Sequence, residues 1–159
     1  SIKVESKYMV GSSFKMEIPI KPIDSLSKST HKKVIYDTPK AGLSILLAED
    51  NDLSLSATSN LLRQIGIHVE VARNGKEAIQ KFLEYPFDLI LMDVSMPIIN
   101  GFEACLKIRE KDVDIPVIAL TANSYADHYK KCIKAKMNDV LYKPFKAYEL
   151  YHIISKYTT

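Results

Sequence analysis

The sequence predicts an α/β fold in which a doubly wound, five-stranded parallel sheet carries helices on both faces. Three observations lead to this prediction. From Ser44 onward, short apolar runs alternate five times with stretches of helical period, a pattern that builds a parallel sheet. The runs are nearly continuous, as in Leu-Ile-Leu-Met at 89–92, which is typical of strands buried on both faces. Four of the runs also stop at a polar residue, and open parallel sheets bind ligands beyond the carboxyl ends of their strands.

The first two strand–helix units follow from local patterns. Ser44–Ala48 is expected to be a short buried strand, and Ile67–Ala72 alternates apolar and polar residues, as a strand nearer the sheet edge does. Between them we expect a helix over Leu53–Ile65, ended by Gly66. Its apolar or small residues are Leu53, Ala57, Leu61, Leu62 and Ile65. After a turn at Asn74-Gly75, a second helix is marked by Ala78, Ile79, Phe82 and Leu83.

The other three units show the same alternation of a strand and a helix. We expect strands at Phe87–Met92, Ile115–Leu120 and Asp139–Tyr142. We expect helices at Gly101–Lys111, Ser124–Ala135 and Ala147–Tyr157. The inward residues of the first of these helices are predicted to be Phe102, Ala104, Cys105 and Ile108.

The first 42 residues have a different pattern. Residues 1–20 hold two alternating runs around Gly11-Ser12-Ser13, which predicts a β-hairpin. Residues 21–42 are rich in Lys, Ser and Pro and are expected to be a solvated linker, so the α/β domain would cover 43–159. Because a lone hairpin is barely stable in water, we expect it to belong with a part of the protein outside this chain.

Composition argues against several classes of function. The formal net charge of +3 over 159 residues is too small to indicate nucleic-acid binding. Cys105 and Cys132 show neither zinc spacing nor a disulfide framework, so we expect idle thiols in a reducing, cytoplasmic compartment. No apolar run approaches the roughly 18 residues of a membrane span, and no secretory signal pattern is present, so we expect no membrane contact by this chain.

Acidic residues follow two of the predicted strands. Glu49 and Asp50 come after the first strand and Asp93 after the third. Three like charges brought together would hold a proton or a cation, and Mg²⁺ prefers oxygen ligands. We expect Asp50 and Asp93 to ligate Mg²⁺ directly and Glu49 to act partly through water. The backbone carbonyl of Ser95 would complete the protein's share of ligands.

The remaining strand ends carry Thr121 and Lys143. Pro144 holds Lys143 extended, and the bond between them is a candidate cis peptide. Each residue alone has a plainer explanation, because acids and Thr cap helices and Lys is common in surface loops. The whole set at one edge of a sheet favours a site for a divalent cation and a phosphoryl group.

Four segments resemble the receiver domain of two-component signalling, in the wording found in hybrid histidine kinases: LLAEDND, LILMDVSMPIINGFEA, VIALTAN and MNDVLYKPF. The resemblance spans roughly residues 44–159, and it implies a flavodoxin-like (βα)5 fold with strand order 2-1-3-4-5. It assigns a role to each residue of the set: Asp93 as phosphoacceptor, Glu49 and Asp50 as Mg²⁺ acids, Thr121 as switch hydroxyl and Lys143 as phosphate-binding lysine.

The resemblance also implies partners. The phosphodonor would be a phosphohistidine on a histidine kinase or a histidine phosphotransfer protein. Its helices would pack near the first helix of the domain, where Leu55, Ser56 and Ser59 are candidate contacts. The alternative for these three residues is a lightly packed face exposed to solvent.

Residues 1–20, SIKVESKYMVGSSFKMEIPI, resemble the last two strands of a histidine-kinase ATP-binding domain. The nucleotide-binding boxes of that domain and a phosphorylatable histidine helix are missing, so this chain is not expected to phosphorylate itself from ATP. The implied parent is a hybrid histidine kinase, with or without a membrane anchor.

Three positions depart from the family pattern. Val140 stands where the family often has Tyr or Phe, so coupled rotation of an aromatic side chain with Thr121 is not implied. Lys136 stands where many relatives have Gly, which predicts strain if its φ is positive. Glu49 stands at a position where the family has Asp, so the negative charge at this position is kept.

Other functions stay open at this point. A receiver fold used only for docking would be expected to lose some site residues, and here the set is intact. A Mg²⁺-dependent phosphatase of the haloacid-dehalogenase type shows Asp-x-Asp, whereas here Ser95 takes the place of the second acid. No Gly-x-Gly-x-x-Gly follows the first strand, which disfavours a flavin or dinucleotide site.

Overall fold

The structure is a computed structural model that describes residues 2–7, 9, 11–17, 38–122 and 126–158. The chain divides into two compact units, residues 1–34 and 35–159. Most of the predicted linker, residues 21–37, lies outside the described residues.

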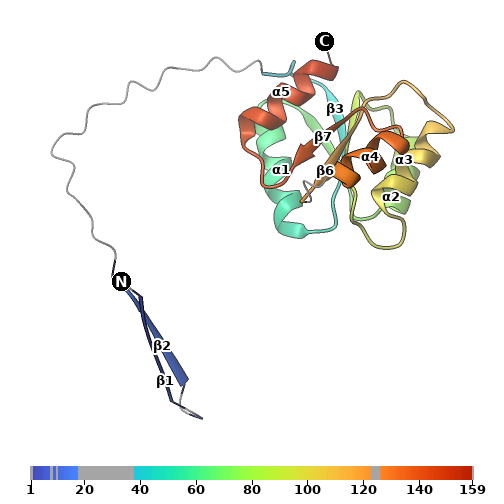
Figure 1. The fold of residues 1–159 in the computed structure, drawn as a ribbon. Coiled ribbons are helices and arrows are strands. Elements are labelled where there is room, and N and C mark those ends of the chain that lie inside the picture. Colours follow the sequence, from blue (N-terminus) through green and yellow to red (C-terminus); the bar gives the residue numbers. More distant parts are fainter. Residues whose placement is uncertain (1, 8, 10, 18–37, 123–125, 159) are drawn as a thin grey trace. The chain divides into compact units, whose positions relative to one another are not determined.

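The first unit contains an antiparallel hairpin of β1 (Ile2–Lys7) and β2 (Gly11–Met16) (Figure 1). This confirms the predicted hairpin. Ile2 lies opposite Met16 and Val4 opposite Phe14, so one face of the hairpin is apolar. Every residue of both strands is exposed to solvent.

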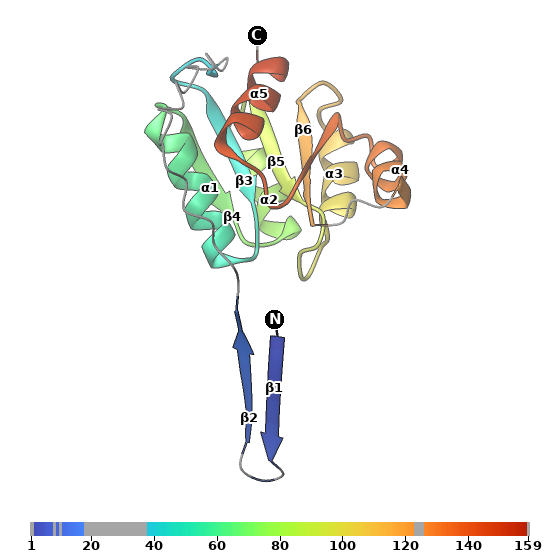
Figure 2. The same cartoon turned by 60° about the vertical axis from the view of Figure 1, so that its left-hand side comes forward.

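The second unit is built on a five-stranded parallel sheet (Figure 2). Its strands are β3 (Ser44–Ala48), β4 (His68–Ala72), β5 (Leu89–Asp93), β6 (Val117–Thr121) and β7 (Asp139–Tyr142). Their order is β4-β3-β5-β6-β7, which confirms the predicted order 2-1-3-4-5 and places β4 at an edge.

Five helices cover the two faces of this sheet, as the doubly wound prediction requires. They are α1 (Asp52–Gln64), α2 (Gly75–Glu84), α3 (Gly101–Arg109), α4 (Ala126–Lys134) and α5 (Ala147–Tyr157). Because side chains alternate along a strand, β5 sends Leu89 and Leu91 into the core under α1 and α5. Its Ile90 and Met92 enter the core under α2, α3 and α4. Burial on both sides explains the continuous apolar runs.

Asparagines start three of the helices at the carboxyl edge of the sheet. Asn51 Oδ1 accepts hydrogen bonds from the N–H groups of Leu53 and Ser54 at 3.1 and 3.0 Å. Asn74 and Asn100 cap α2 and α3 in the same way. The predicted turn at Asn74-Gly75 is therefore a helix start, because Gly75 is already the first residue of α2.

The buried face of α1 includes only part of the apolar or small residues that predicted the helix. Leu53 is 83% exposed and Ala57 is also exposed, whereas the buried residues are Leu55, Thr58, Ser59 and Leu62. Of the residues that mark the helical period, Leu62 is buried, and Leu61 and Ile65 are partly buried against the core, so the period identified the helix but not its whole buried face. Where a helix packs closely on a sheet, the small side chains of Thr and Ser are also buried.

Candidate functional site

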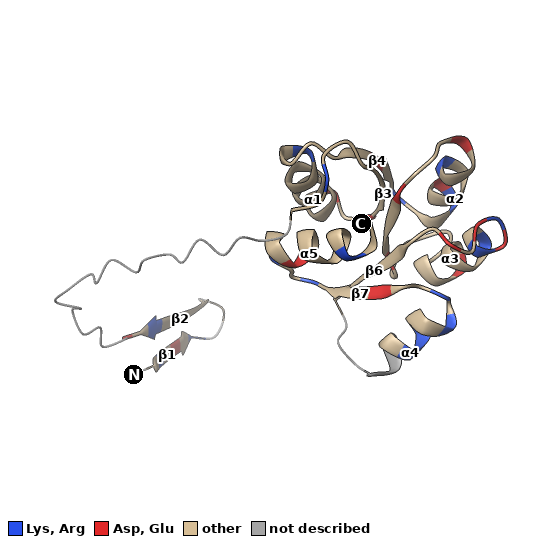
Figure 3. Cartoon of the chain, turned by 90° about the horizontal axis from the view of Figure 1, so that it is seen from above, with Lys and Arg blue, Asp and Glu red and all other residues tan. Residues whose placement is uncertain are grey.

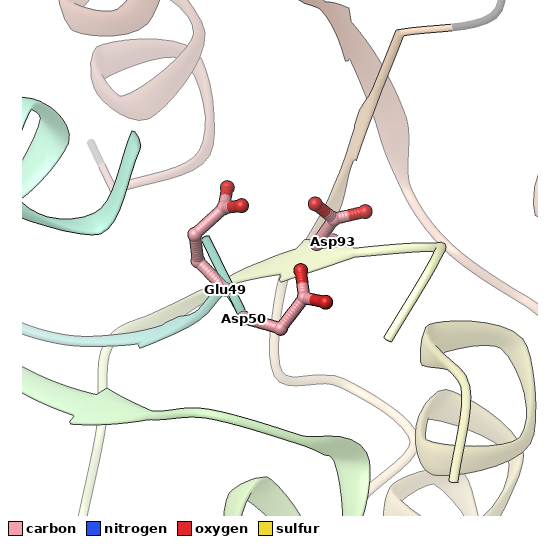
Figure 4. A group of neighbouring side chains, drawn as sticks. All are labelled: Glu49, Asp50 and Asp93. Carbon is pink, nitrogen blue, oxygen red and sulfur yellow. The ribbon is translucent and has the colours of Figure 1, made fainter. Parts of the chain in front are cut away.

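Three acidic residues meet at the carboxyl ends of β3 and β5 (Figure 4). Glu49 and Asp50 follow β3, Asp93 is the last residue of β5, and the two strands pair directly. One carboxylate oxygen from each residue lies within 4.8 Å of those of the other two. Glu49 and Asp93 are buried, whereas Asp50 is exposed, so the cluster opens to solvent on the Asp50 side.

Lys143 joins this cluster from the loop after β7. Its Nζ lies 2.6 Å from Asp93 Oδ2 and also donates to Glu49 Oε2. The backbone N–H of Lys143 donates to the Thr121 carbonyl at 2.7 Å, and the peptide bond to Pro144 is cis, as anticipated. The sequence-distant acids and the lysine therefore occupy one site, as predicted from the strand ends.

Burial and pairing act in opposite directions on the pKa values here. Burial raises the pKa of Glu49 above its usual 4.5, although the ion pair with Lys143 acts against this. Burial alone would lower the pKa of Lys143, but its bonds to Asp93 and Glu49 outweigh that effect and raise it above the usual 10.5. Lys143 is thus held in its charged form.

The donor set suits a hard divalent cation. Three ionised carboxylates and one ammonium leave a net charge of two negatives (−3 + 1 = −2). All of the carboxylate donors are oxygens, which Mg²⁺ prefers. Of the residues that the structure describes, this is the one group of three or more His, Cys, Asp or Glu with metal-binding spacing.

Thr121 and Val140 lie on the strands next to the cluster. Thr121 is the last residue of β6, is 2% exposed, and comes one residue after Leu120, which pairs with Asp93. Val140 is half-buried in β7 and packs against the core under α2, α3 and α4. The aromatic residue of β7 is instead Tyr142, which pairs with Thr121 and is 41% exposed.

Backbone groups around Asp93 were not predicted. The N–H of Ser95 donates to Asp93 Oδ1 at 2.8 Å, so both oxygens of Asp93 are engaged. Gly101 begins α3 so close to Asp93 that a Cβ there would lie 2.1 Å from the Asp93 carbonyl oxygen. The glycine in the motif MPIING was the available signal for this close approach.

The loop between Asp93 and α3 contains a strained residue. Ile98 has φ of 70°, and the N–H of Ile99 donates to the Pro97 carbonyl at 2.8 Å, which makes a γ-turn centred on Ile98. A β-branched residue is unfavourable in this region. Its side chain is 75% exposed, so burial does not compensate for the strain.

The partner contacts expected on α1 need correction. Leu55 and Ser59 are 8% and 2% exposed and face the core, so neither can contact a partner, whereas Ser56 is exposed.

An open groove of about 380 Å³ runs beside α1. It is lined by Ser54, Ala57, Leu61, Ala122, Pro144 and Phe145, with Lys143 at its border. Within the described part of the chain, no helix is long and apolar enough to cross a membrane.

Residues 45–155 match the family described as response regulator receiver domain. The chain belongs to this family. A curated relative, the signal transduction histidine-protein kinase BarA of Escherichia coli strain K12, is 32% identical over 146 residues. The alignment covers 87% of this chain but only 16% of BarA, so the receiver chain spans a small part of that relative.

Two solved structures bear on the site of this receiver. The receiver domain of sensor histidine kinase PA1611 from Pseudomonas aeruginosa PAO1 is 37% identical with a TM-score of 0.71, covering 74% of this chain and 98% of that one. It was crystallised with a magnesium ion coordinated in its active-site cleft. The Saccharomyces cerevisiae co-crystal of Ypd1, a histidine phosphotransfer protein, with the Ssk1 receiver domain matches at 28% identity and TM-score 0.70, covering 76% and 90%.

Proposed function

We propose that this receiver accepts a phosphoryl group from a phosphohistidine onto Asp93. The observation that carries the proposal is the contact of Lys143 with Asp93 inside an acidic cluster that is open on the Asp50 side. Glu49, Asp50, Asp93, Thr121 and Lys143 all lie within residues 45–155, the part of the chain that matches the family, which supports the proposal.

In this mechanism a carboxylate oxygen of Asp93 attacks phosphorus. The new P–O bond forms as the P–N bond to the donor imidazole breaks, and the imidazole leaves with the electron pair of that bond. Phosphoryl transfer depends mainly on positioning and charge neutralisation. Lys143, already 2.6 Å from Asp93, neutralises a phosphoryl oxygen, and the Ser95 N–H holds the orientation of the Asp93 carboxylate.

Asp50 and Asp93 would hold Mg²⁺ directly in this receiver, with Glu49 acting partly through water and the Ser95 carbonyl as a further ligand. The oxygen-only carboxylate set and its net negative charge support this assignment. When bound, the ion would neutralise charge on the phosphoryl oxygens. Thr121 would bond the phosphoryl group after transfer, and Val140 leaves that switch without an aromatic partner at its position.

The donor would be a histidine kinase or a histidine phosphotransfer protein. The Ypd1–Ssk1 co-crystal supports a phosphotransfer protein as the class of partner. The groove beside α1 borders Lys143, so a helix docked there would place its histidine near Asp93. Nucleic acid and membrane have no part in this proposal.

For the parent protein, we propose a hybrid histidine kinase. Residues 1–20 would be the end of its ATP-binding domain, 21–42 a linker, and 43–159 the receiver. The exposed apolar face of the hairpin supports this assignment, because such a face needs a covering layer. The chain would work in the cytoplasm, where a kinase forms phosphohistidine from ATP, and would not itself be a kinase.

Intact-protein mass tests the phosphoacceptor assignment. Exposure to acetyl phosphate and Mg²⁺ should add the mass of one phosphoryl group to the wild type and to the exposed control Asp114→Asn, but none to Asp93→Asn. Labelling of Asp93→Asn to the wild-type extent would refute the assignment. No labelling of the wild type would favour the alternative, a receiver fold used only for docking.

A further inference from the structure

An open cavity of about 510 Å³ lies at the amino edge of the sheet, beside the edge strand β4. Ser44 and His68, the first residues of β3 and β4, both line it. The acidic cluster follows the carboxyl ends of the strands, so this cavity is at the opposite end of the sheet. We call it the β4 cavity. The residues of its lining that matter here are Arg63, Ile67, His68, Glu70, Tyr85 and Phe87.

The two helices that contact β4, α1 and α2, each have a cation in their last turn (Figure 3). On α2 it is Lys81, which pairs with Glu70, the one acid among the described residues of the lining. On α1 it is Arg63, which donates a single hydrogen bond of 3.3 Å to the Val69 carbonyl. Arg63 has no acidic partner in the described part of the chain, so its charge is the one that the cavity leaves uncompensated.

Further groups that can donate hydrogen bonds border the cavity. The side chains of His68 and Tyr85 are exposed, and neither forms a hydrogen bond with another residue that the structure describes. The N–H of His68 donates to the Leu43 carbonyl, so the next residue, Val69, directs its own N–H away from the sheet. A ligand that supplies acceptors would satisfy these donors together with Arg63.

Apolar side chains form the other part of the lining. Ile67 is buried, Phe87 is half-buried against the core under α2, α3 and α4, and the ring of Tyr85 is 54% exposed. Sites for small ligands combine such apolar and aromatic walls with a few polar groups, in cavities of roughly 300–1,000 Å³. The β4 cavity has this size and this combination.

We propose that the β4 cavity binds a small organic carboxylate that carries an aromatic ring. The carboxylate would accept hydrogen bonds from Arg63 and its neighbouring donors, and the ring would lie against Tyr85 and Phe87. These apolar walls favour such a ligand over an inorganic anion, which makes no use of them. Arg63 already occupies the Val69 carbonyl, so the edge of β4 lacks an acceptor that an added strand from another chain would need.

NMR titration of the full chain with three probes tests the proposal. The probes are naphthoate, acetate, which has the carboxylate without the ring, and naphthamide, which has the ring without the charge. We expect naphthoate to bind with a Kd on the order of 1 mM and to shift the amide signals of residues 67–70 and 85–87. Acetate and naphthamide should each bind at least about tenfold more weakly. Equal binding of either probe, or shifts confined to other elements, would overturn the proposal. Shifts of the same amides with protein concentration alone would show instead that a second copy of the chain covers this edge.

Matched variants separate this cavity from general positive charge. Arg63→Gln should weaken naphthoate binding about tenfold, as expected for the loss of a charge-assisted hydrogen bond. The control Arg73→Gln removes the same charge just beyond the other end of β4, where Arg73 pairs with Asp52, and should change binding less than about twofold. Asp93→Asn should bind naphthoate as the wild type does, because it changes the opposite end of the sheet. Equal losses in Arg63→Gln and in either other variant would contradict the proposal.

Two variants of Tyr85 separate the ring contact from the hydroxyl contact. Tyr85→Phe keeps the ring, so it should retain the preference for naphthoate over acetate and weaken both about threefold. Tyr85→Ser keeps a hydroxyl but loses the ring, so it should reduce that preference at least about threefold. Tyr129→Ser, at 48% exposure on α4, is the control and should leave the preference unchanged. A Tyr85→Ser variant with the preference of the wild type would exclude the aromatic ring from the cavity and refute the proposal.

Discussion

Lys143 is the residue on which the charge balance of the site depends. Of the described residues, it is the only cation paired with Glu49 and Asp93, and it comes from a loop 50 residues after Asp93. Its side chain is 18% exposed, and those of Glu49 and Asp93 are 2% and 11% exposed. A pair this buried is costly to break by removing one partner, because the other charges remain without compensation.

Lys143→Ala should therefore lower the free energy of unfolding by about 2–3 kcal/mol at neutral pH without Mg²⁺. The folded-state pKa of Glu49 is already above 4.5, and loss of the lysine would raise it further. A group whose pKa is raised on folding contributes stability below its unfolded pKa and loses it as pH rises. The loss of unfolding free energy in Lys143→Ala, relative to the wild type, should thus be smallest near pH 4 and largest above the folded-state pKa of Glu49.

Urea unfolding at acidic and neutral pH measures this difference. Mg²⁺ should restore part of the lost stability, since an ion that binds only the folded state stabilises it. Lys156→Ala is the control, because it removes a more exposed lysine that pairs with Asp139 at 2.8 Å. A deficit in Lys143→Ala that is equal at both pH values would contradict the proposed role of Glu49.

Ile98 provides a second test at the residue scale. Its φ of 70° costs a β-branched residue about 1–2 kcal/mol, and Asn tolerates this conformation better. Since Ile98 is 75% exposed, Ile98→Asn loses little burial and should raise stability by about 1 kcal/mol. Val113→Asn is the matched control, at 67% exposure and without positive φ. If urea unfolding shows the same change in the free energy of unfolding for both substitutions, Ile98 is not strained.

At the scale of elements, the strand order was predictable from the sequence. The bounds of the helices and strands were predictable to within about two residues. α5 and β7 have the predicted bounds, because each begins and ends at a clear change of pattern. The inward face of α1 did not follow, since Thr58 and Ser59 are buried by close packing rather than by apolarity. Sequence period identifies a helix, but the neighbouring element decides which side is buried.

The site was predictable to a similar extent. The strand-end rule brought Glu49, Asp50, Asp93 and Lys143 together, because parallel strands end at one edge. The Ser95 N–H contact and the strain at Ile98 depend on the path of one loop, which side-chain types do not specify. The proposed roles of Thr121 and Val140 depend on a change of conformation after phosphorylation, which the residue types at the strand ends do not specify.

Arg109 joins the end of α3 to two other segments. It is 6% exposed and donates to the carbonyls of Lys136 at 2.9 Å and Ile115 at 2.7 Å, and to Asn138 Oδ1 at 2.7 Å. An ammonium cannot reach these three acceptors from one position as the planar guanidinium does. The turn between α4 and β7 is therefore fixed by a single buried side chain.

Arg109→Lys should lower the free energy of unfolding by about 3 kcal/mol, since it leaves buried acceptors unpaired. Arg63→Lys is the control, because Arg63 is exposed and donates one bond of 3.3 Å to Val69. That change should cost less than about 0.5 kcal/mol. Similar losses in the two variants would show that the buried hydrogen bonds of Arg109 do not stabilise the fold.

At the scale of the whole chain, the two units differ in how they are stabilised. The receiver unit has two buried cores, one on each face of its sheet. The hairpin has none of its own, and Ile2, Val4, Phe14 and Met16 are between 56% and 75% exposed. Two strands without a covering layer are marginal in water, so the hairpin contributes little to the stability of this chain.

Truncation to residues 38–159 should therefore leave the melting temperature within about 2 °C of the full chain, because the cores of the receiver are intact. The full chain should self-associate at high concentration through the apolar face of the hairpin, and the truncated chain should not. Replacing Val4 and Phe14 by Thr should suppress the association without changing the melting temperature. A fall of many degrees on truncation, measured by scanning calorimetry, would show that the hairpin stabilises the receiver, and would weaken its assignment to an upstream domain.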